Sequence, residues 1–204
     1  MRAIASYERT LVVNDTPYDR WSRGDARAIS ESAKRGWALF NGKANCAECH
    51  AAPLFGSDDI DPIGTPDLDE SGRLVRGSDP GLARLSGSKD DFGAFRATSL
   101  RSAAGGGPYM HNAAFRTLEE VVDFYDKGGA VGLGLAVPRQ DPAVRKLHLT
   151  AAEQADLVAF LRALEQDKPL DRAPDRVPSG LHPGGAQPVR TSSGSSTTAS
   201  RETR

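Results

Sequence analysis

Residues 46–50 read Cys-Ala-Glu-Cys-His, the C-x-x-C-H pattern through which c-type haem is attached. Because Cys46 and Cys49 are three residues apart, a helical turn places them on one face, where their sulfurs can reach two vinyl groups of one porphyrin. His50 follows at once and can bind the iron. The motif therefore predicts one covalent haem c, with His50 as the proximal ligand.

Two other uses of a C-x-x-C pair fit the chain less well. A redox-active disulfide of the thioredoxin type would need a strand before the motif and a helix after it, and the surrounding sequence does not have that pattern. A zinc site would need a second pair of ligands at comparable spacing, which His111, His148 and His182 do not form. Gly132-x-Gly134 lacks the third glycine of a dinucleotide-binding loop.

Composition narrows the function further. The 204 residues allow one domain with appendages, and a net charge of -1 argues against a basic nucleic-acid-binding face. Hydrophobic residues make up only 38% of the chain, as expected if a large apolar cofactor fills part of the interior. No apolar run approaches the roughly 20 residues that span a bilayer, and no export signal is predicted at the start.

Apolar spacing and capping patterns predict four helices. Thr117 and Thr150 each begin a capping box, in which a glutamate follows three residues later. The last helix is expected to cross the one before the haem motif and close the haem crevice. The predicted helices cover residues 3–12, 30–41, 117–125 and 150–164.

The remaining segments predict irregular structure. Residues 52–107 are dense in Gly, Pro, Asp and Ser, which favours loop with at most short helical turns. Residues 168–204 are dominated by Pro, Gly, Ser and Thr and predict a disordered tail. The sequence therefore predicts an all-α, cytochrome-c-like haem domain with long loops over residues 26–167.

Several motifs in fixed order resemble the C-terminal half of the bacterial di-haem cytochrome c peroxidases and of their relative MauG. Family members have two haem domains, each with its own C-x-x-C-H, whereas this chain has one such motif. The resemblance implies that residues 1–25 are an interdomain-type linker, and that an N-terminal haem domain with an export signal is missing. The matching segments are residues 5–11, 32–40, 46–55, 93–101, 107–111, 117–125 and 149–161.

The ligand opposite His50 decides the iron chemistry. Spacing makes Met110 a candidate, with apolar packing against the haem as the alternative role. The resemblance places Tyr125 at the distal position, which is methionine in the peroxidases and tyrosine in MauG-like members. A phenolate favours oxidised iron, whereas a thioether favours reduced iron. His111 is a candidate for the distal side behind the ligand, or a loop histidine bonded to backbone.

Other residues are assigned to the periphery of the haem. Arg101 is favoured over Arg96 as the partner of a haem propionate, because guanidinium groups pair with carboxylates in a bidentate manner. The resemblance implies a calcium ion held partly by backbone carbonyls of Gly106 and Pro108. The chain departs from the family at residues 97–100, which read Ala-Thr-Ser-Leu in place of Thr-Pro-Ser-Leu. At residues 111–113, His-Asn-Ala replaces His-Asp-Gly.

The resemblance implies electron transfer in a periplasmic, peroxidase-type system that reduces hydrogen peroxide or oxidises a partner protein. A donor cytochrome or cupredoxin would supply electrons. The residues alone support haem binding and electron transfer, and leave open whether this half is itself an enzyme. Two alternatives are a mono-haem electron carrier, favoured if Met110 binds the iron, and an inactive haem-binding fragment.

Overall fold

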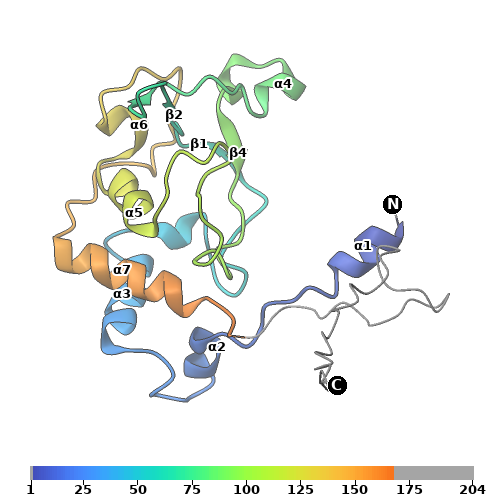
Figure 1. Cartoon of the computed structure of the whole chain (residues 1–204), viewed down its shortest axis with the longest axis vertical. Coiled ribbons are helices and arrows are strands. Elements are labelled where there is room, and N and C mark those ends of the chain that lie inside the picture. Colours follow the sequence, from blue (N-terminus) through green and yellow to red (C-terminus); the bar gives the residue numbers. More distant parts are fainter. Residues whose placement is uncertain (1, 168–204) are drawn as a thin grey trace, which may run out of the picture. The chain divides into compact units, whose positions relative to one another are not determined.

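The computed structural model describes residues 2–167, and the predicted tail at residues 168–204 lies outside the described residues. The chain begins with α1 (Arg2–Glu8), which is shorter than the predicted helix and ends where the Thr10 hydroxyl donates to the carbonyl of Tyr7. Within residues 2–167, no helix has both the length and the apolar character needed to cross a membrane. Figure 1 shows the arrangement of the elements.

A second short helix, α2 (Pro17–Ser22), lies within residues 1–25, the segment for which the resemblance implies an interdomain-type linker. The hydroxyl of Thr16 accepts from the amide of Asp19, and the Asp19 carboxylate accepts from the amide of Thr16, which makes a capping box with a proline in the first turn. Tyr18 of this helix is buried among the rings of Trp37 and Phe55. Residues 17–22 therefore pack into the same core as the haem motif.

The helices α3 (Glu31–Asn41) and α7 (Ala151–Ala163) lie against each other, as the sequence predicts (Figure 1). Gly36 is at their contact, where a Cβ atom would overlap the backbone carbonyl of Asp156. The carboxylate of Asp156 accepts two bonds from Arg35, at 2.7 and 2.8 Å, and so joins the two helices at their surface. Thr150, predicted to begin a capping box, is the N-cap of α7, and Ser30 is the N-cap of α3.

An aromatic cluster fills the space between these helices and the haem motif. Phe40 of α3, Phe160 of α7 and Phe55 of the loop after His50 are each at most 1% exposed, with ring centroids 5.0 to 6.0 Å apart. The helix α5 (Leu118–Asp126) adds further apolar side chains, and Cys46 packs against the cluster. The core therefore supports the turn that carries the cysteines.

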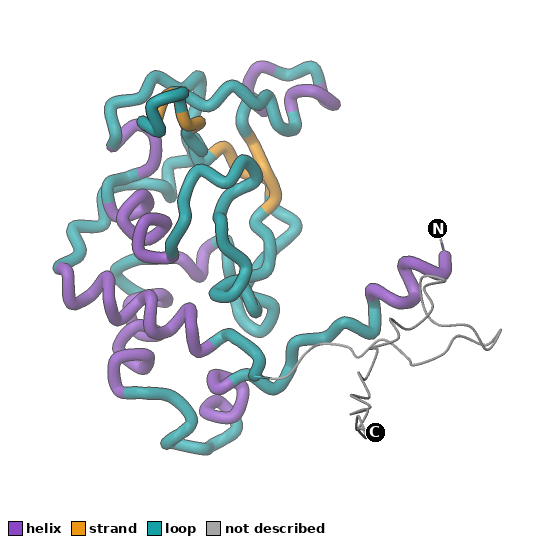
Figure 2. The backbone as a smooth tube through the Cα atoms, viewed as in Figure 1, coloured by secondary structure: helices purple, strands orange, loops and turns teal. Residues whose placement is uncertain are grey.

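The prediction of an all-α fold is wrong, because residues 52–107 contain paired strands. The strand β1 (Ile60–Pro62) pairs antiparallel with β4 (Ala94–Arg96), and β2 (Asp67–Leu68) pairs antiparallel with β3 (Leu74–Val75). The fold is mixed, with long loops (Figure 2). Strands of two or three residues are too short to show the alternation that predicts them. The described part of the chain also includes α4 (Ala83–Ser86), α6 (Gly129–Gly132) and the 3-10 turns η1 (Cys46–Glu48) and η2 (Lys89–Asp91).

Candidate haem site

The two cysteines lie at the 3-10 turn η1, which begins after Asn45 in a left-handed conformation with φ of 54°. Both thiols are free and partly buried. Burial raises the pKa of Cys46 to about 12. Burial and the nearby Asp61 carboxylate raise the pKa of Cys49 to about 11. Both side chains are therefore protonated thiols at neutral pH, three residues apart on one turn.

His50 continues this turn, because its amide donates to the carbonyl of Cys46 at 2.9 Å. Its Nδ1 lies 3.1 Å from the carbonyl oxygen of Phe55. Burial lowers the pKa of His50, so the imidazole is neutral at pH 7. A neutral ring whose Nδ1–H donates to Phe55 keeps the lone pair of Nε2, which is the nitrogen a metal would bind.

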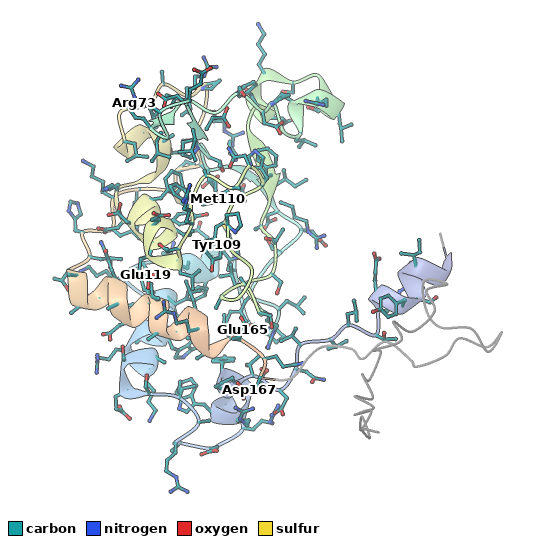
Figure 3. All side chains as sticks on the ribbon, in the orientation of Figure 1. Arg73, Tyr109, Met110, Glu119, Glu165 and Asp167 are labelled. Carbon is teal, nitrogen blue, oxygen red and sulfur yellow. The ribbon has the colours of Figure 1, made fainter. Side chains whose placement is uncertain are left out.

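Tyr125, near the end of α5, lies within electrostatic reach of both thiols. Burial, followed by the nearby Cys46 and Cys49, raises the pKa of Tyr125 well above its usual value. Met110 packs in the same apolar cluster as Tyr125, around Phe124, and Figure 3 shows Met110 next to Tyr109 in the loop beside α5. The structure thus brings both predicted distal ligands into one cluster, and Tyr125 is near enough to the thiols for them to affect its pKa.

Similar proteins share this region and extend beyond it. The chain is 37% identical to cytochrome-c peroxidase IdrP1 of Pseudomonas sp. strain SCT, over 89% of this chain and 53% of that protein. It is 40% identical to the methylamine utilization protein MauG of Methylophilus methylotrophus, over 80% of this chain and 46% of that protein. No protein-family model matches. The chain spans about half the length of these curated relatives.

Solved structures agree with these relatives. A MauG-like protein associated with microbial copper homeostasis superposes with a TM-score of 0.59 at 31% identity, over 76% of this chain and 52% of that one. The diheme peroxidase BthA from Burkholderia thailandensis superposes with a TM-score of 0.57 at 26% identity, over 75% and 46%. The chain belongs to the di-haem cytochrome c peroxidase and MauG family.

The residues at this site fit the haem c of that family. Two free thiols and an imidazole follow one another on a single turn, and a backbone carbonyl holds the Nδ1 side of the imidazole. A phenol and a thioether from other parts of the chain provide candidate distal ligands. Thiols, imidazole and phenol or thioether are the donors that c-type and related haems use.

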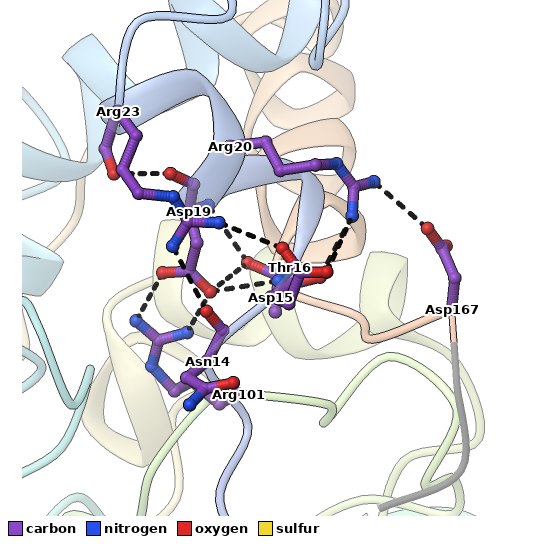
Figure 4. Close-up of polar contacts among 9 residues, drawn as sticks. Asn14, Asp15, Thr16, Asp19, Arg20, Arg23, Arg101 and Asp167 are labelled. Carbon is purple, nitrogen blue, oxygen red and sulfur yellow. Dashed lines mark hydrogen bonds and ion pairs between the residues drawn. The ribbon is translucent and has the colours of Figure 1, made fainter.

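Arg101, the predicted propionate partner, contacts the loop that follows His50. Its Nη1 and Nη2 donate to the carboxylate of Asp19, both at 2.9 Å (Figure 4). Its Nε donates to the carbonyl of Pro53 at 2.7 Å. These bonds use three of the five N–H groups of Arg101, and two are left for a haem propionate. The propionate role stays a prediction. Asp19 was not among the predicted site residues, although the Thr16-x-x-Asp19 spacing signals its capping role.

We expect the stabilisation by Asp19 to depend on pH. Burial alone would raise the pKa of Asp19, but hydrogen bonds from Arg101 and Thr16 lower it from 3.8 to about 2. A carboxylate with a lowered pKa stabilises the fold above its ordinary pKa, and this contribution is lost as the pH falls from about 4 through 2. Asp19→Asn should lower the free energy of unfolding by about 2 kcal/mol at pH 7 and by much less near pH 2. Urea unfolding at both pH values measures this, and an equal loss at both would contradict it.

His111, the predicted distal-side histidine, stacks on Phe95 with ring centroids 3.8 Å apart. Its Nε2 is 3.8 Å from a carboxylate oxygen of Asp79, and it lines a small cavity together with Asp67 and Arg139. Its partners are therefore side chains rather than the backbone groups considered for a loop histidine. Its role behind the distal ligand stays a prediction.

Asn112 forms hydrogen bonds that join the loop carrying Met110 and His111 to residues 66 and 67. Its Nδ2 donates to the carbonyl of Pro66 and to the carboxylate of Asp67, both at 2.8 Å. Asp67 begins β2, so the loop is bound to the β2–β3 pair. The resemblance implies an aspartate at this position in the family, and an aspartate here would face the Asp67 carboxylate and be repelled by it. The structure therefore gives a reason for the departure from the family motif.

Asn112→Asp is expected to destabilise the protein by about 1–3 kcal/mol, because it replaces a donor by a second carboxylate beside Asp67. Asn112→Ala is the control, since it removes the hydrogen bonds without adding charge. Thermal unfolding of the two variants should rank Asn112→Asp as the less stable. Equal stability of the two variants at pH 7 would show that charge repulsion at Asp67 does not matter.

Proposed function

We propose that this chain is the electron-transferring, C-terminal haem half of a periplasmic peroxidase-type protein. A donor cytochrome or cupredoxin would supply the electrons, and a preceding haem domain would use them to reduce hydrogen peroxide or to oxidise a partner protein. The observation that carries the proposal is the grouping of Cys46, Cys49 and His50 on one turn, with the Tyr125 phenol near both thiols. The names of the relatives, cytochrome-c peroxidase and MauG, support it.

Each residue of the site has a distinct part in this proposal. The haem, when bound, supplies one-electron chemistry between ferrous and ferric iron. Cys46 and Cys49 hold the edge of the porphyrin. His50 would supply Nε2 as the proximal ligand, and its Nδ1–H bond to the Phe55 carbonyl fixes the plane of the ring and strengthens it as a donor. Tyr125 is partly buried and protonated at neutral pH, and its phenol, once deprotonated, would favour ferric iron as the distal ligand.

The proposal also covers the segments around the site. Residues 26–167 form the haem domain, and residues 1–25 link it to the preceding haem domain. One calcium ion would lie between the two domains, held partly by the carbonyls of Gly106 and Pro108. Calcium takes backbone carbonyls among its oxygen ligands, so these groups suit it. Arg101 would pair with a propionate through the N–H groups that its bonds to Asp19 and Pro53 leave unused.

The test compares wild type with Tyr125→Phe after co-expression with the haem-attachment machinery and an added export signal. We expect covalent haem in both proteins and altered ferric visible and EPR spectra in Tyr125→Phe, because the variant cannot supply a phenolate. Tyr109→Phe is the matched control. It removes a hydroxyl that donates to the carbonyl of Ala104 at 2.9 Å, and should leave the spectra unchanged.

A mono-haem electron carrier is the second candidate, because Met110 packs in the same cluster as Tyr125. In that case Met110→Leu, and not Tyr125→Phe, would remove the sulfur–iron band of the ferric spectrum. Covalent haem that neither variant affects, with no response to peroxide, would favour the inactive fragment. Failure of the wild type to acquire any covalent haem would overturn the proposal of a haem site.

A further inference from the structure

Residues 99–101 donate hydrogen bonds to three consecutive backbone carbonyls, those of residues 53–55, in the loop after the haem motif. The carbonyl of Pro53 accepts from Nε of Arg101 at 2.7 Å. The next carbonyl, that of Leu54, accepts from the hydroxyl of Ser99 at 2.6 Å. Two neighbouring peptide groups therefore have their orientation fixed by side chains from one short segment.

The third carbonyl in this run is that of Phe55, and it has two partners. The amide of Leu100 donates to it at 2.9 Å, and Nδ1 of His50 lies 3.1 Å from it. The Phe55 ring is fully buried in the aromatic cluster, and the Phe55 amide donates to the carbonyl of Ala51 at 2.7 Å. The position of the Phe55 carbonyl, which orients His50, is therefore fixed by residues 99–101.

Asp19 fixes Arg101 from the side of the N-terminal segment. The two Nη atoms of Arg101 donate to the two carboxylate oxygens of Asp19, and the side chains are 11% and 10% exposed (Figure 4). The guanidinium carbon lies 5.3 Å from the centroid of the Phe55 ring. A bidentate charged pair with so little exposure holds the guanidinium in one plane. A continuous chain of contacts therefore runs from α2 through Arg101 to the residue that faces His50.

We propose that Asp19 is a positioning residue for the proximal histidine. Through Arg101 it keeps the Phe55 carbonyl on Nδ1–H of His50, so that α2 sets the plane and the donor strength of the iron ligand. The partner of the non-ligating nitrogen fixes the orientation of a metal-binding imidazole and raises its basicity. A displacement of α2 would therefore change the orientation of the His50 ring and its strength as an iron ligand. This inference rests on the proposed haem site only in that His50 binds the iron.

The experiment compares Asp19→Asn with Asp156→Asn in the haem-loaded protein. Asp156 is the matched control, because it accepts a similar bidentate pair from Arg35 but joins α3 to α7 instead of reaching the loop after His50. We expect both variants to unfold at lower temperature. Only Asp19→Asn should shift the ferric EPR g values, the His50 Nδ1–H resonance in proton NMR and the reduction potential.

Arg101→Lys separates position from charge, because it keeps the positive charge and cannot form the bidentate pair. It should shift the same Nδ1–H resonance, and it serves as the test if Asp19→Asn does not fold. Wild-type EPR and NMR spectra in both variants, with lowered unfolding temperatures, would overturn the positioning role and leave the haem site standing. A wild-type protein without covalent haem would instead overturn the haem site itself.

Discussion

Gly36→Ala is expected to destabilise the domain by about 3 kcal/mol or more, although alanine is the better helix former by about 1 kcal/mol. The added Cβ would overlap the backbone carbonyl of Asp156 and press on the Cβ of Phe160. Neither atom is the end of a flexible side chain, so α3 and α7 would have to move apart. That movement would also disturb the aromatic cluster, in which Phe160 is fully buried.

The control is Ala38→Gly on the same helix, where Ala38 is exposed. It should cost only about 1 kcal/mol, from helix propensity alone. Thermal and urea unfolding of both variants would separate the two effects. If Gly36→Ala were as stable as wild type, the close approach of the two helices would not be a tight packing constraint.

The helices around the site could be predicted because their signals are local. Ser30, Thr117 and Thr150 begin α3, α5 and α7 as expected, and the capping boxes at Thr117 and Thr150 are both formed. A cap depends on residues within one turn, so no knowledge of tertiary contacts is needed to identify it. The same local signal is present at α2, where Thr16, Pro17 and Asp19 form a capping box with a proline in the first turn, although no helix was predicted there.

The strands could not be predicted in the same way. β1 and β4 are three residues each and are separated by more than thirty residues, so their pairing depends on long-range contacts. Both contain residues that disfavour strands, such as Pro62 at the end of β1. Residues 52–107 were therefore predicted as loop because they are rich in glycine and proline, and the paired strands within them were missed. For this reason the predicted fold class was wrong.

At the candidate haem site, too, some residues could be predicted from the sequence and others could not. The C-x-x-C-H motif identifies the thiols and His50 because the chemistry requires those side chains at that spacing. The partner of His50 is a backbone carbonyl, that of Phe55, and such a group carries no residue-type signal. The same applies to Asp19, which reaches Arg101 across 82 positions of sequence. Sequence patterns indicate ligands, whereas the groups that orient them become visible only in the folded chain.

Replacing both Cys46 and Cys49 with serine is expected to remove all covalent haem. In the proposed site each thiol would add across one vinyl group of the porphyrin to form a thioether, and a hydroxyl does not undergo this addition under the same conditions. Each single variant should keep the haem through one remaining thioether. Denaturing electrophoresis with haem staining, together with the mass of the intact chain, would show the full loss in the double variant and retention in the single variants.

Met110→Leu is the control for this loss, because it removes the other sulfur in the haem region and should leave the covalent attachment intact. The double variant should also unfold at a lower temperature than the wild-type holoprotein, since a cofactor that binds only the folded state stabilises it. Haem-stained bands that persist in the double variant after denaturation would contradict thioether attachment at these two residues. The turn η1 would then have to hold the haem through His50 alone, and the spacing of the two cysteines would need another explanation.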